Sequence, residues 1–140
     1  MDKKNIKSHL EKHDICPSYQ RILIYKYLYE NRTHPTLSEI FENLKDKIPT
    51  LSKMTIYNTI KLFVEKKITQ YISIDDNEIR CDVYVDFHGH FKCCQCGKIY
   101  DFPIKKDCMI FRGLDGFDVK KKNIYLYGIC KKCKIEGAKK

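Results

Sequence analysis

Residues 52–85, which read SKMTIYNTIKLFVEKKITQYISIDDNEIRCDVYV, decide the fold of the first half of this chain. The stretch begins with a serine, a good helix N-cap, and its apolar residues then recur at the 3.6-residue spacing of a helix. The rest predicts two strands, residues 68–74 and 79–85, joined by the turn residues Asp75-Asp76-Asn77. A helix followed by a β-hairpin is typical of the end of a winged-helix domain.

Three further helices are predicted upstream of this stretch. Residues 4–13 suit a short polar helix, and Ser18 can cap a second helix that reaches about Asn31. The segment Thr36-Leu-Ser-Glu39 matches a capping box, and Pro49 ends the helix that it starts. Helices followed by a hairpin give the element order of a winged helix, whose last helix enters the major groove of DNA.

The helix that begins after Ser52 has two contrasting faces. Ile56, Ile60 and Phe63 fall on one side of a helical wheel and suit the core. The other side carries a tyrosine, an asparagine and a lysine, which suit a DNA groove, although a solvated helix face is the alternative. The predicted DNA contacts are Tyr57, Asn58 and Lys61, with Ser52 and Thr55 near phosphates.

The net charge favours an anionic partner but does not locate it. The 140 residues include 27 Lys and Arg against 18 Asp and Glu, which gives a net charge of +9. Residues 1–79 hold 13 basic and 11 acidic side chains, whereas residues 80–140 hold 14 and 7. The excess therefore lies in the second half, where a solvated basic surface stays open as an alternative to a nucleic-acid contact.

The chain carries no sign of an export or membrane segment. No apolar run approaches the ~20 residues that cross a bilayer, and the N-terminal sequence MDKKNIKSHLEKHD lacks the apolar stretch of a secretory signal. We therefore expect a cytoplasmic protein with no membrane partner. Because thiols are kept reduced in that compartment, the eight cysteines are candidate metal ligands rather than four disulfides.

Two matched cysteine pairs form the strongest metal signal. They are Cys93-x-x-Cys96, followed by Gly97, and Cys130-x-x-Cys133. Two intervening residues let a tight turn bring both sulfurs to one metal ion, and two such turns complete a tetrahedral structural Zn²⁺ site. A thioredoxin-like redox pair is the alternative, but it leaves the second pair unexplained.

A second donor cluster surrounds His88-Gly89-His90. Alternate residues of a strand share a face, so both imidazoles can reach one ion. Asp82 precedes them, Asp101 follows them, and His34 lies far upstream. Nitrogen and carboxylate donors without thiolate favour Fe²⁺, Mn²⁺ or Zn²⁺. A paired surface His-x-His that holds no ligand is the alternative.

Several motifs in a fixed order resemble the ferric uptake regulator (Fur) family, from about Ser18 to Cys133. They are His34-Pro35-Thr36, Ser52-x-x-Thr55-Ile56-Tyr57-Asn58, Arg80-x-Asp82, His88-x-His90-x-x-Cys93-x-x-Cys96-Gly97-Lys98-Ile99-x-Asp101 and Tyr127-Gly128-x-Cys130-x-x-Cys133. The resemblance implies a metal-dependent transcriptional repressor that binds a double-stranded DNA operator as a homodimer.

The expected fold class is α+β, in two domains. Residues 1–84 form a winged-helix DNA-binding domain. Residues 85–140 form a small α/β dimerisation domain with a Cys₄ zinc site, and the hinge lies at about residues 84–88. Residues 104–112 are expected to form a short helix in the second domain, and residues 117–129 alternate as a strand does.

The resemblance also assigns the metal ligands. The structural Zn²⁺ is held by Cys93, Cys96, Cys130 and Cys133. The regulatory Fe²⁺ or Mn²⁺ is held by His34, Asp82, His88, His90 and Asp101. One ion bridging both domains would favour the closed dimer that spans two operator half-sites.

Within the family, the peroxide-responsive (PerR) branch fits best. Its members carry Asp at the position of Asp82, where iron sensors usually carry Glu. The resemblance then implies that bound Fe²⁺ reacts with hydrogen peroxide, that His34 or His88 is oxidised and that DNA affinity is lost. An iron- or zinc-responsive repressor of metal uptake is the alternative.

Some features depart from the family pattern. Residues 102–119, which hold the dimerisation helix in relatives, are a few residues short. Four cysteines match no ligand position, and we expect two of them, Cys81 and Cys108, to fill the core. The other two are Cys16 and Cys94, and a redox role for Cys94, beside the zinc pair, is the less favoured alternative.

No enzyme activity is expected. Zinc deaminases need His-x-Glu beside Pro-Cys-x-x-Cys, whereas His90 stands at the Glu position and no proline precedes Cys93. The metalloprotease motif His-Glu-x-x-His is absent from the sequence. A zinc-ribbon module for protein interaction stays open for the second half taken alone.

Overall fold

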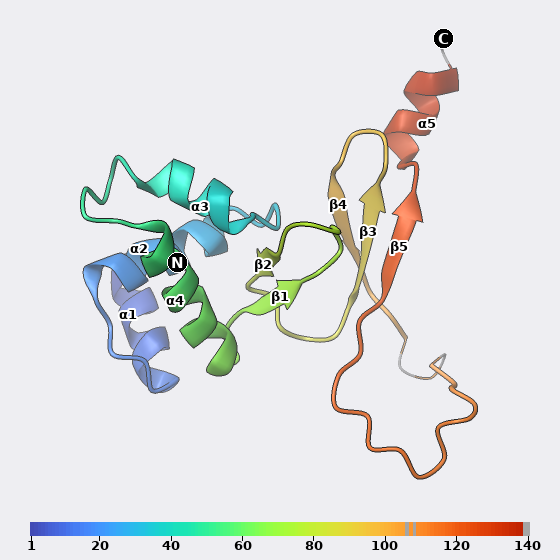
Figure 1. Ribbon diagram of the computed structural model, residues 1–140, viewed down its shortest axis with the longest axis horizontal. Helices are drawn as coiled ribbons and strands as arrows, with labels where there is room; N and C mark the ends of the chain where they lie inside the picture. The colour runs from blue at the N-terminus through green and yellow to red at the C-terminus, as the bar shows by residue number, and fades with distance from the viewer. Residues whose placement is uncertain (106, 108, 139–140) are drawn as a thin grey trace. The chain divides into compact units, whose positions relative to one another are not determined.

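The computed structural model describes residues 1–105, 107 and 109–138. It divides into two compact units, Met1–Val85 and Asp86–Lys140, called here the N-terminal and C-terminal units (Figure 1). Helices and small sheets occur together, so the predicted α+β class is confirmed. Within the described residues, no helix combines the length and the apolar character needed to cross a bilayer.

Four helices build most of the N-terminal unit, each started by a polar N-cap. They are α1 (Lys3–Lys12), α2 (Tyr19–Glu30), α3 (Leu37–Leu44) and α4 (Lys53–Glu65). The caps of the last three are Ser18, Thr36 and Ser52, whose side-chain oxygens accept backbone N–H groups three residues on. The capping box between Thr36 and Glu39 is formed, so the predicted helix starts are confirmed.

The predicted end of α3 near Pro49 is wrong by about one turn. The helix stops at Leu44, and the backbone N–H groups of Lys47 and Ile48 both donate to its carbonyl at 3.0 Å. Ile48 is nevertheless 2% exposed. The apolar periodicity thus located a buried residue correctly, but a tight turn rather than a helix delivers it to the core.

The core of the N-terminal unit forms where α4 crosses the other helices. Ile56, Ile60 and Phe63 are fully buried on α4, and the ring of Phe63 meets Tyr25 of α2 edge-on at 5.7 Å. Tyr57, Asn58 and Lys61 are exposed. Hence the predicted division of α4 into a core face and a solvent face is confirmed.

A two-stranded hairpin, the wing, follows α4 and also makes backbone contacts with the segment that precedes α3. Strands β1 (Gln70–Ile72) and β2 (Arg80–Asp82) are antiparallel, shorter than predicted. On its other edge, β2 bridges to Thr36, and Cys81 donates its N–H to the carbonyl of Pro35 at 2.9 Å. The hairpin therefore fixes a segment that is distant in sequence.

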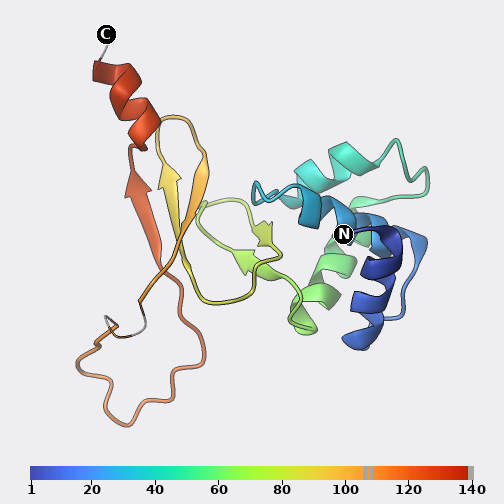
Figure 2. The same cartoon turned by 180° about the vertical axis from the view of Figure 1, so that it is seen from behind.

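The C-terminal unit is a three-stranded sheet followed by a helix. Strands β3 (Gly89–Cys93), β4 (Ile99–Phe102) and β5 (Tyr125–Gly128) lie in the order β4-β3-β5, and β3 pairs antiparallel with β4 but parallel with β5. Helix α5 (Lys131–Ala138) directly follows β5, at the end of the sheet where β3 turns into β4 (Figure 2). Helix α5 therefore lies beside the turn that joins β3 and β4, at the opposite end of β3 from the start of the unit.

Of two further predictions for this unit, one gave a strand that is too long and the other falls partly outside the described residues. The predicted strand of residues 117–129 is much longer than β5, which has four residues. The expected helix of residues 104–112 includes Lys106 and Cys108, and both lie outside the described residues.

Candidate metal centres

Four cysteine sulfurs converge at the end of the C-terminal unit. Cys93 ends β3, Cys96 lies in the following turn, and Cys130 and Cys133 flank the start of α5. The four Sγ atoms lie within 4.8 Å of one another, with 3.9 Å between Cys96 and Cys130. All four are free thiols. Such spacing is what a tetrahedral ion with Zn–S bonds near ~2.3 Å requires.

Hydrogen bonds from backbone N–H groups favour the ionised form of one of these thiols. The N–H of Cys96 and that of Cys130 donate to Cys93 Sγ, at 3.5 and 3.3 Å, and lower the pKa of the Cys93 thiol to about 6. The pKa of Cys133 is raised instead, because its thiol bonds to the sulfur of Cys130. Neighbouring sulfurs compete for negative charge, and a cation among them would relieve that competition. The donor set therefore fits structural Zn²⁺.

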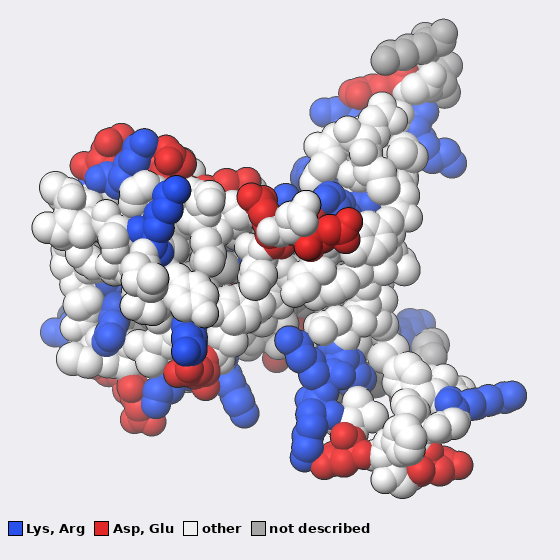
Figure 3. Space-filling model, in the orientation of Figure 1, with Lys and Arg blue, Asp and Glu red and all other residues white. Residues whose placement is uncertain are grey.

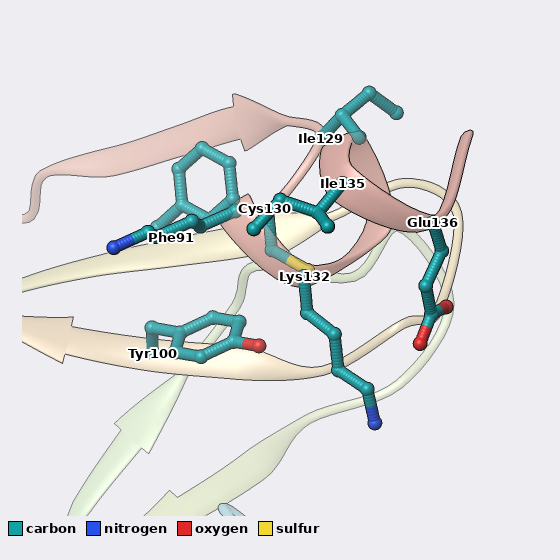
Figure 4. A pocket seen from close by; sticks show the side chains of 8 residues that line it. Phe91, Tyr100, Ile129, Cys130, Lys132, Ile135 and Glu136 are labelled. Atoms are coloured by element: carbon teal, nitrogen blue, oxygen red, sulfur yellow. The ribbon is translucent and has the colours of Figure 1, made fainter. Parts of the chain in front are cut away.

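Aromatic rings shield one side of the cysteine cluster. Phe91 and Tyr100 pack against it, and the Tyr100 hydroxyl bonds to Cys130, which raises the pKa of Tyr100 to about 12. The two rings line an apolar pocket of about 660 Å³, with Ile129 and Ile135 on the side of α5 (Figure 4). The surroundings of the sulfurs are thus largely apolar, which strengthens their interaction with a cation.

Two histidines and a carboxylate meet at the other end of β3. His90 and Asp101 are paired across β3 and β4, and His90 Nε2 lies 3.3 Å from Asp101 Oδ1. His88 Nε2 lies 3.4 Å from the same oxygen, and the two imidazole centroids are 4.4 Å apart. Both rings are buried, whereas the Asp101 side chain is 41% exposed. The C-terminal unit therefore gathers three of the predicted ligands.

A hydrogen bond to the backbone fixes which ring nitrogen of His88 faces Asp101. His88 Nδ1 lies 2.7 Å from the carbonyl oxygen of Asp86, and a carbonyl only accepts, so Nδ1 carries the hydrogen. Nε2 is therefore the ring nitrogen that faces Asp101, and it is the atom that can act as a metal ligand. A backbone carbonyl on the second ring nitrogen is the usual support of a metal-binding histidine.

Gly89 allows β3 and β4 to approach between the two histidines. A Cβ atom at this position would collide with the end of the ring of Phe102, its partner across the strands. Only glycine lets the Phe102 ring cover the backbone here. The middle residue of the His-x-His motif is therefore a packing requirement.

The N-terminal unit brings together the remaining two predicted ligands. His34 is 3% exposed and Asp82 is 6% exposed, and His34 Nε2 lies 3.7 Å from Asp82 Oδ2. Asp82 Oδ1 also accepts the N–H of Tyr84 at 2.9 Å. The wing supplies the carboxylate, and the loop before α3 supplies the imidazole. His34 and Asp82 are 48 positions apart in the sequence, so without the family resemblance their spacing does not predict that they meet.

The surface of α4 is open to a partner, although two of the predicted DNA contacts are already used. Ser52 Oγ accepts the N–H of Thr55 at 3.0 Å, and the two hydroxyls lie 2.8 Å apart. A polar hollow of about 450 Å³ next to them is lined by Thr55, Asn58 and Arg21 among others. Acidic and basic side chains are interspersed over the N-terminal unit on the face drawn in Figure 3. Charge alone therefore marks no DNA site there.

The remaining cysteines differ in their surroundings. Cys81 is 1% exposed, and burial raises the pKa of its thiol to about 12, so the expected core role is confirmed. Cys16 and Cys94 are exposed. Cys108 lies outside the described residues.

Comparisons with known proteins agree with one another. The sequence model of the ferric uptake regulator family matches residues 12–127. The peroxide-responsive repressor PerR of Staphylococcus epidermidis is 36% identical over 121 residues, which cover 84% of this chain and 81% of the relative. PerR of Staphylococcus aureus (strain USA300) is 37% identical over 117 residues, which cover 81% and 79%.

Solved structures are similar along most of the chain. PerR of Streptococcus pyogenes, studied for peroxide sensing and gene regulation, is 28% identical with a TM-score of 0.54, covering 94% of this chain and 92% of its own. The ferric uptake regulator of Helicobacter pylori has a TM-score of 0.70 at 18% identity, covering 96% and 95%. The latter likeness supports the fold alone.

The cysteine cluster leads to a matched pair of substitutions. Cys93→Ser removes a sulfur that lies among the other three, so we expect bound zinc to be lost and the C-terminal unit to unfold, because such sites contribute on the order of 10 kcal/mol to folding. Cys94→Ser alters an exposed neighbour and should keep both zinc and fold. Elemental analysis and proteolysis of the purified variants would check this. Equal zinc content in the two variants would contradict the assignment.

The close approach at Gly89 leads to a second prediction. Gly89→Ala forces the Phe102 ring to move and should lower the free energy of unfolding of the zinc-loaded protein by about 1–3 kcal/mol. Gly137→Ala is the control, because a Cβ there meets nothing within 4 Å. Urea unfolding of both variants measures the difference. A Gly89→Ala protein as stable as the control would show that the ring has room to spare.

Proposed function

This chain belongs to the ferric uptake regulator family of transcriptional regulators, and we propose that it is a peroxide-responsive repressor whose DNA binding depends on a regulatory metal ion. The observation that carries the proposal is the pairing of buried imidazoles with a carboxylate in each unit. His34 meets Asp82 in the N-terminal unit, and two histidines meet Asp101 in the C-terminal unit.

In the proposed site, one Fe²⁺ or Mn²⁺ ion takes ligands from both units. The ligands are His34, Asp82, His88, His90 and Asp101. The mixture of imidazole and carboxylate, without thiolate, suits Fe²⁺ or Mn²⁺ better than a soft metal, while the four cysteines take Zn²⁺. Within each unit the donor atoms already lie 3.3–3.7 Å apart, so little rearrangement is needed inside a unit to bind.

The chain's residues then convert metal binding into DNA affinity. Because the two sets of ligands flank the boundary between Val85 and Asp86, shared coordination restricts the angle between the units. In a homodimer, that restriction selects the arrangement in which both α4 helices reach the half-sites of a double-stranded operator. We propose that α4 contacts the operator through Tyr57, Asn58 and Lys61, with Ser52 and Thr55 near phosphates, and that the protein acts in the cytoplasm.

Peroxide sensing follows from the same ligands. Fe²⁺ held by these ligands would supply the redox chemistry that activates hydrogen peroxide. In the net reaction one peroxide oxygen would be inserted into a ring C–H bond of a ligand histidine and the other would leave as water, with no net change in the iron. Oxygen added to the ring of His34 or His88 removes a nitrogen donor, so the units lose their shared ligand set and the operator is released. The two relatives named above are peroxide-responsive repressors. The motif resemblance of the sequence also places Asp82 where that branch is expected to carry an aspartate.

An iron- or zinc-responsive repressor of metal uptake is the second candidate, because the family model that matches this chain is that of the ferric uptake regulators. The two differ in what releases DNA. Metal depletion releases DNA from either kind of repressor, whereas peroxide at a constant metal concentration releases DNA only from the peroxide-responsive kind. An enzymatic role is not part of either proposal.

The peroxide mechanism has a direct test. Peroxide treatment of the Fe²⁺-loaded protein should add oxygen to the peptide that holds His34 or His88 and abolish operator binding, as seen by mass spectrometry and gel shift. The Mn²⁺-loaded protein is the control and should keep both peptides unmodified. In addition, Asp82→Glu should reduce peroxide sensitivity more than Mn²⁺-dependent operator binding. Loss of DNA binding with both peptides intact would exclude histidine oxidation.

The DNA-binding face has a separate test with two exposed helical asparagines. Asn58→Ala should weaken operator binding by about 1–3 kcal/mol and relax its sequence preference, because an asparagine amide reads an adenine edge with two hydrogen bonds. Asn43→Ala, on α3, should leave affinity unchanged. Fluorescence anisotropy with operator and scrambled DNA measures both effects. Equal affinities for the two variants would remove Asn58 from the interface.

A further inference from the structure

His34 has an energetically unfavourable backbone conformation. Its φ angle is +57°, in the left-handed region that side chains other than glycine avoid at a cost of about 1–3 kcal/mol. It also precedes Pro35, which restricts the preceding residue further. Neighbouring contacts must therefore hold this residue in place.

The wing provides those contacts through β2. Cys81 donates its N–H to the carbonyl of Pro35, and the backbones of Arg80 and Thr36 form an isolated antiparallel β-bridge. The guanidinium of Arg80 adds a contact to the strained residue itself, because Nη1 donates to the carbonyl of His34 at 3.0 Å. Two backbone contacts and one side-chain contact therefore fix residues 34–36.

Arg80 is itself held rigidly. Its Nε donates to Oδ2 of Asp75 in the turn of the wing, and the two side chains are only 17% and 11% exposed. A guanidinium is planar, so an ion pair on one edge fixes the direction of the N–H groups on the other. The orientation of the His34 carbonyl is thereby tied to the tip of the wing.

The same strand carries the carboxylate that faces the His34 ring. Arg80 and Asp82 are two positions apart on β2 and so point to one side of it, the first binding the backbone of His34 and the second approaching its imidazole at 3.7 Å. Resting on the proposed function, we propose that Arg80, oriented by Asp75, is a positioning residue of the regulatory metal site that sets where His34 Nε2 stands relative to Asp82.

A purely structural role in the hairpin makes a different prediction. An arginine that only stabilises the wing affects metal affinity equally whether or not His34 is a ligand. An arginine that acts through His34 loses its influence when the imidazole is removed. A double-mutant cycle separates the two cases.

The cycle compares Arg80→Met, His34→Ala and the double variant in the full zinc-loaded chain, with Mn²⁺ titrations followed by electron paramagnetic resonance of the free ion. Arg80→Met should weaken Mn²⁺ binding about 10- to 100-fold, the range for partners that orient ligands. In the His34→Ala background, the same change should matter by less than about twofold. The optical spectrum of bound Co²⁺ should shift in Arg80→Met as well.

Matched controls keep the test decisive. Lys45→Met removes an exposed ion pair of the same unit, with Glu42 at 2.7 Å, and should leave Mn²⁺ affinity unchanged. Should Arg80→Met not fold, Arg80→Lys keeps the charge but not the planar fork and should show a smaller loss, while Asp75→Asn tests the anchor.

Three results would overturn the proposal, and they are distinguishable. Parent-like Mn²⁺ affinity in the Arg80 variants, or an equal loss with and without His34, refutes the role of Arg80 while the metal site stands. An unchanged affinity in His34→Ala shows that His34 is not a ligand, which refutes the proposed two-unit site and, with it, the role of Arg80.

Discussion

The bridge between Thr36 and Arg80 is the contact on which the N-terminal half of the proposed metal site depends. It joins a loop before α3 to the second strand of the wing, two segments that would otherwise be independent. Through this bridge, a buried imidazole at His34 and a buried carboxylate at Asp82 come to lie side by side. Each of the two side chains has the other as a partner in the interior, and the proposed metal ion would bind at this pair.

Strand β3 imposes a corresponding constraint in the C-terminal unit. His90 and Cys93 lie on the same five-residue strand, so the histidine group and the cysteine cluster are attached to opposite ends of one rigid element. Zinc at the cysteines would fix β3 against the start of α5, and Gly89 lets β4 close over the other end. In the proposed mechanism, the zinc ion would thus support the geometry of the regulatory site without sharing a ligand with it.

Local signals predicted most of the fold. Polar caps at Ser18, Thr36 and Ser52 located the starts of three helices, because capping depends on neighbours within one turn. Ends and lengths were less accessible, as α3 and β5 show, because they depend on packing that periodicity does not specify. The zinc ligands could be predicted from their spacing, since each pair is local in sequence.

The N-terminal ligands were a different case. His34 and Asp82 are far apart in the chain, and only a resemblance to relatives suggested that they act together. The roles of Asp75 and Arg80 carried no local signal, since a charged residue in a hairpin is ordinarily solvated. The left-handed backbone of His34 was equally hidden, because glycine and asparagine are the residues that mark such positions.

The central claim is that one ion takes ligands from both units, and electron–nuclear double resonance of the Mn²⁺-loaded protein tests it most directly. With ¹⁵N-labelled histidine, the account predicts nitrogen couplings from His34 together with those from His88 and His90, and the loss of one coupling in His34→Ala. A spectrum that is identical in the parent and in His34→Ala would contradict the account, because the ion would then take no nitrogen donor from the N-terminal unit.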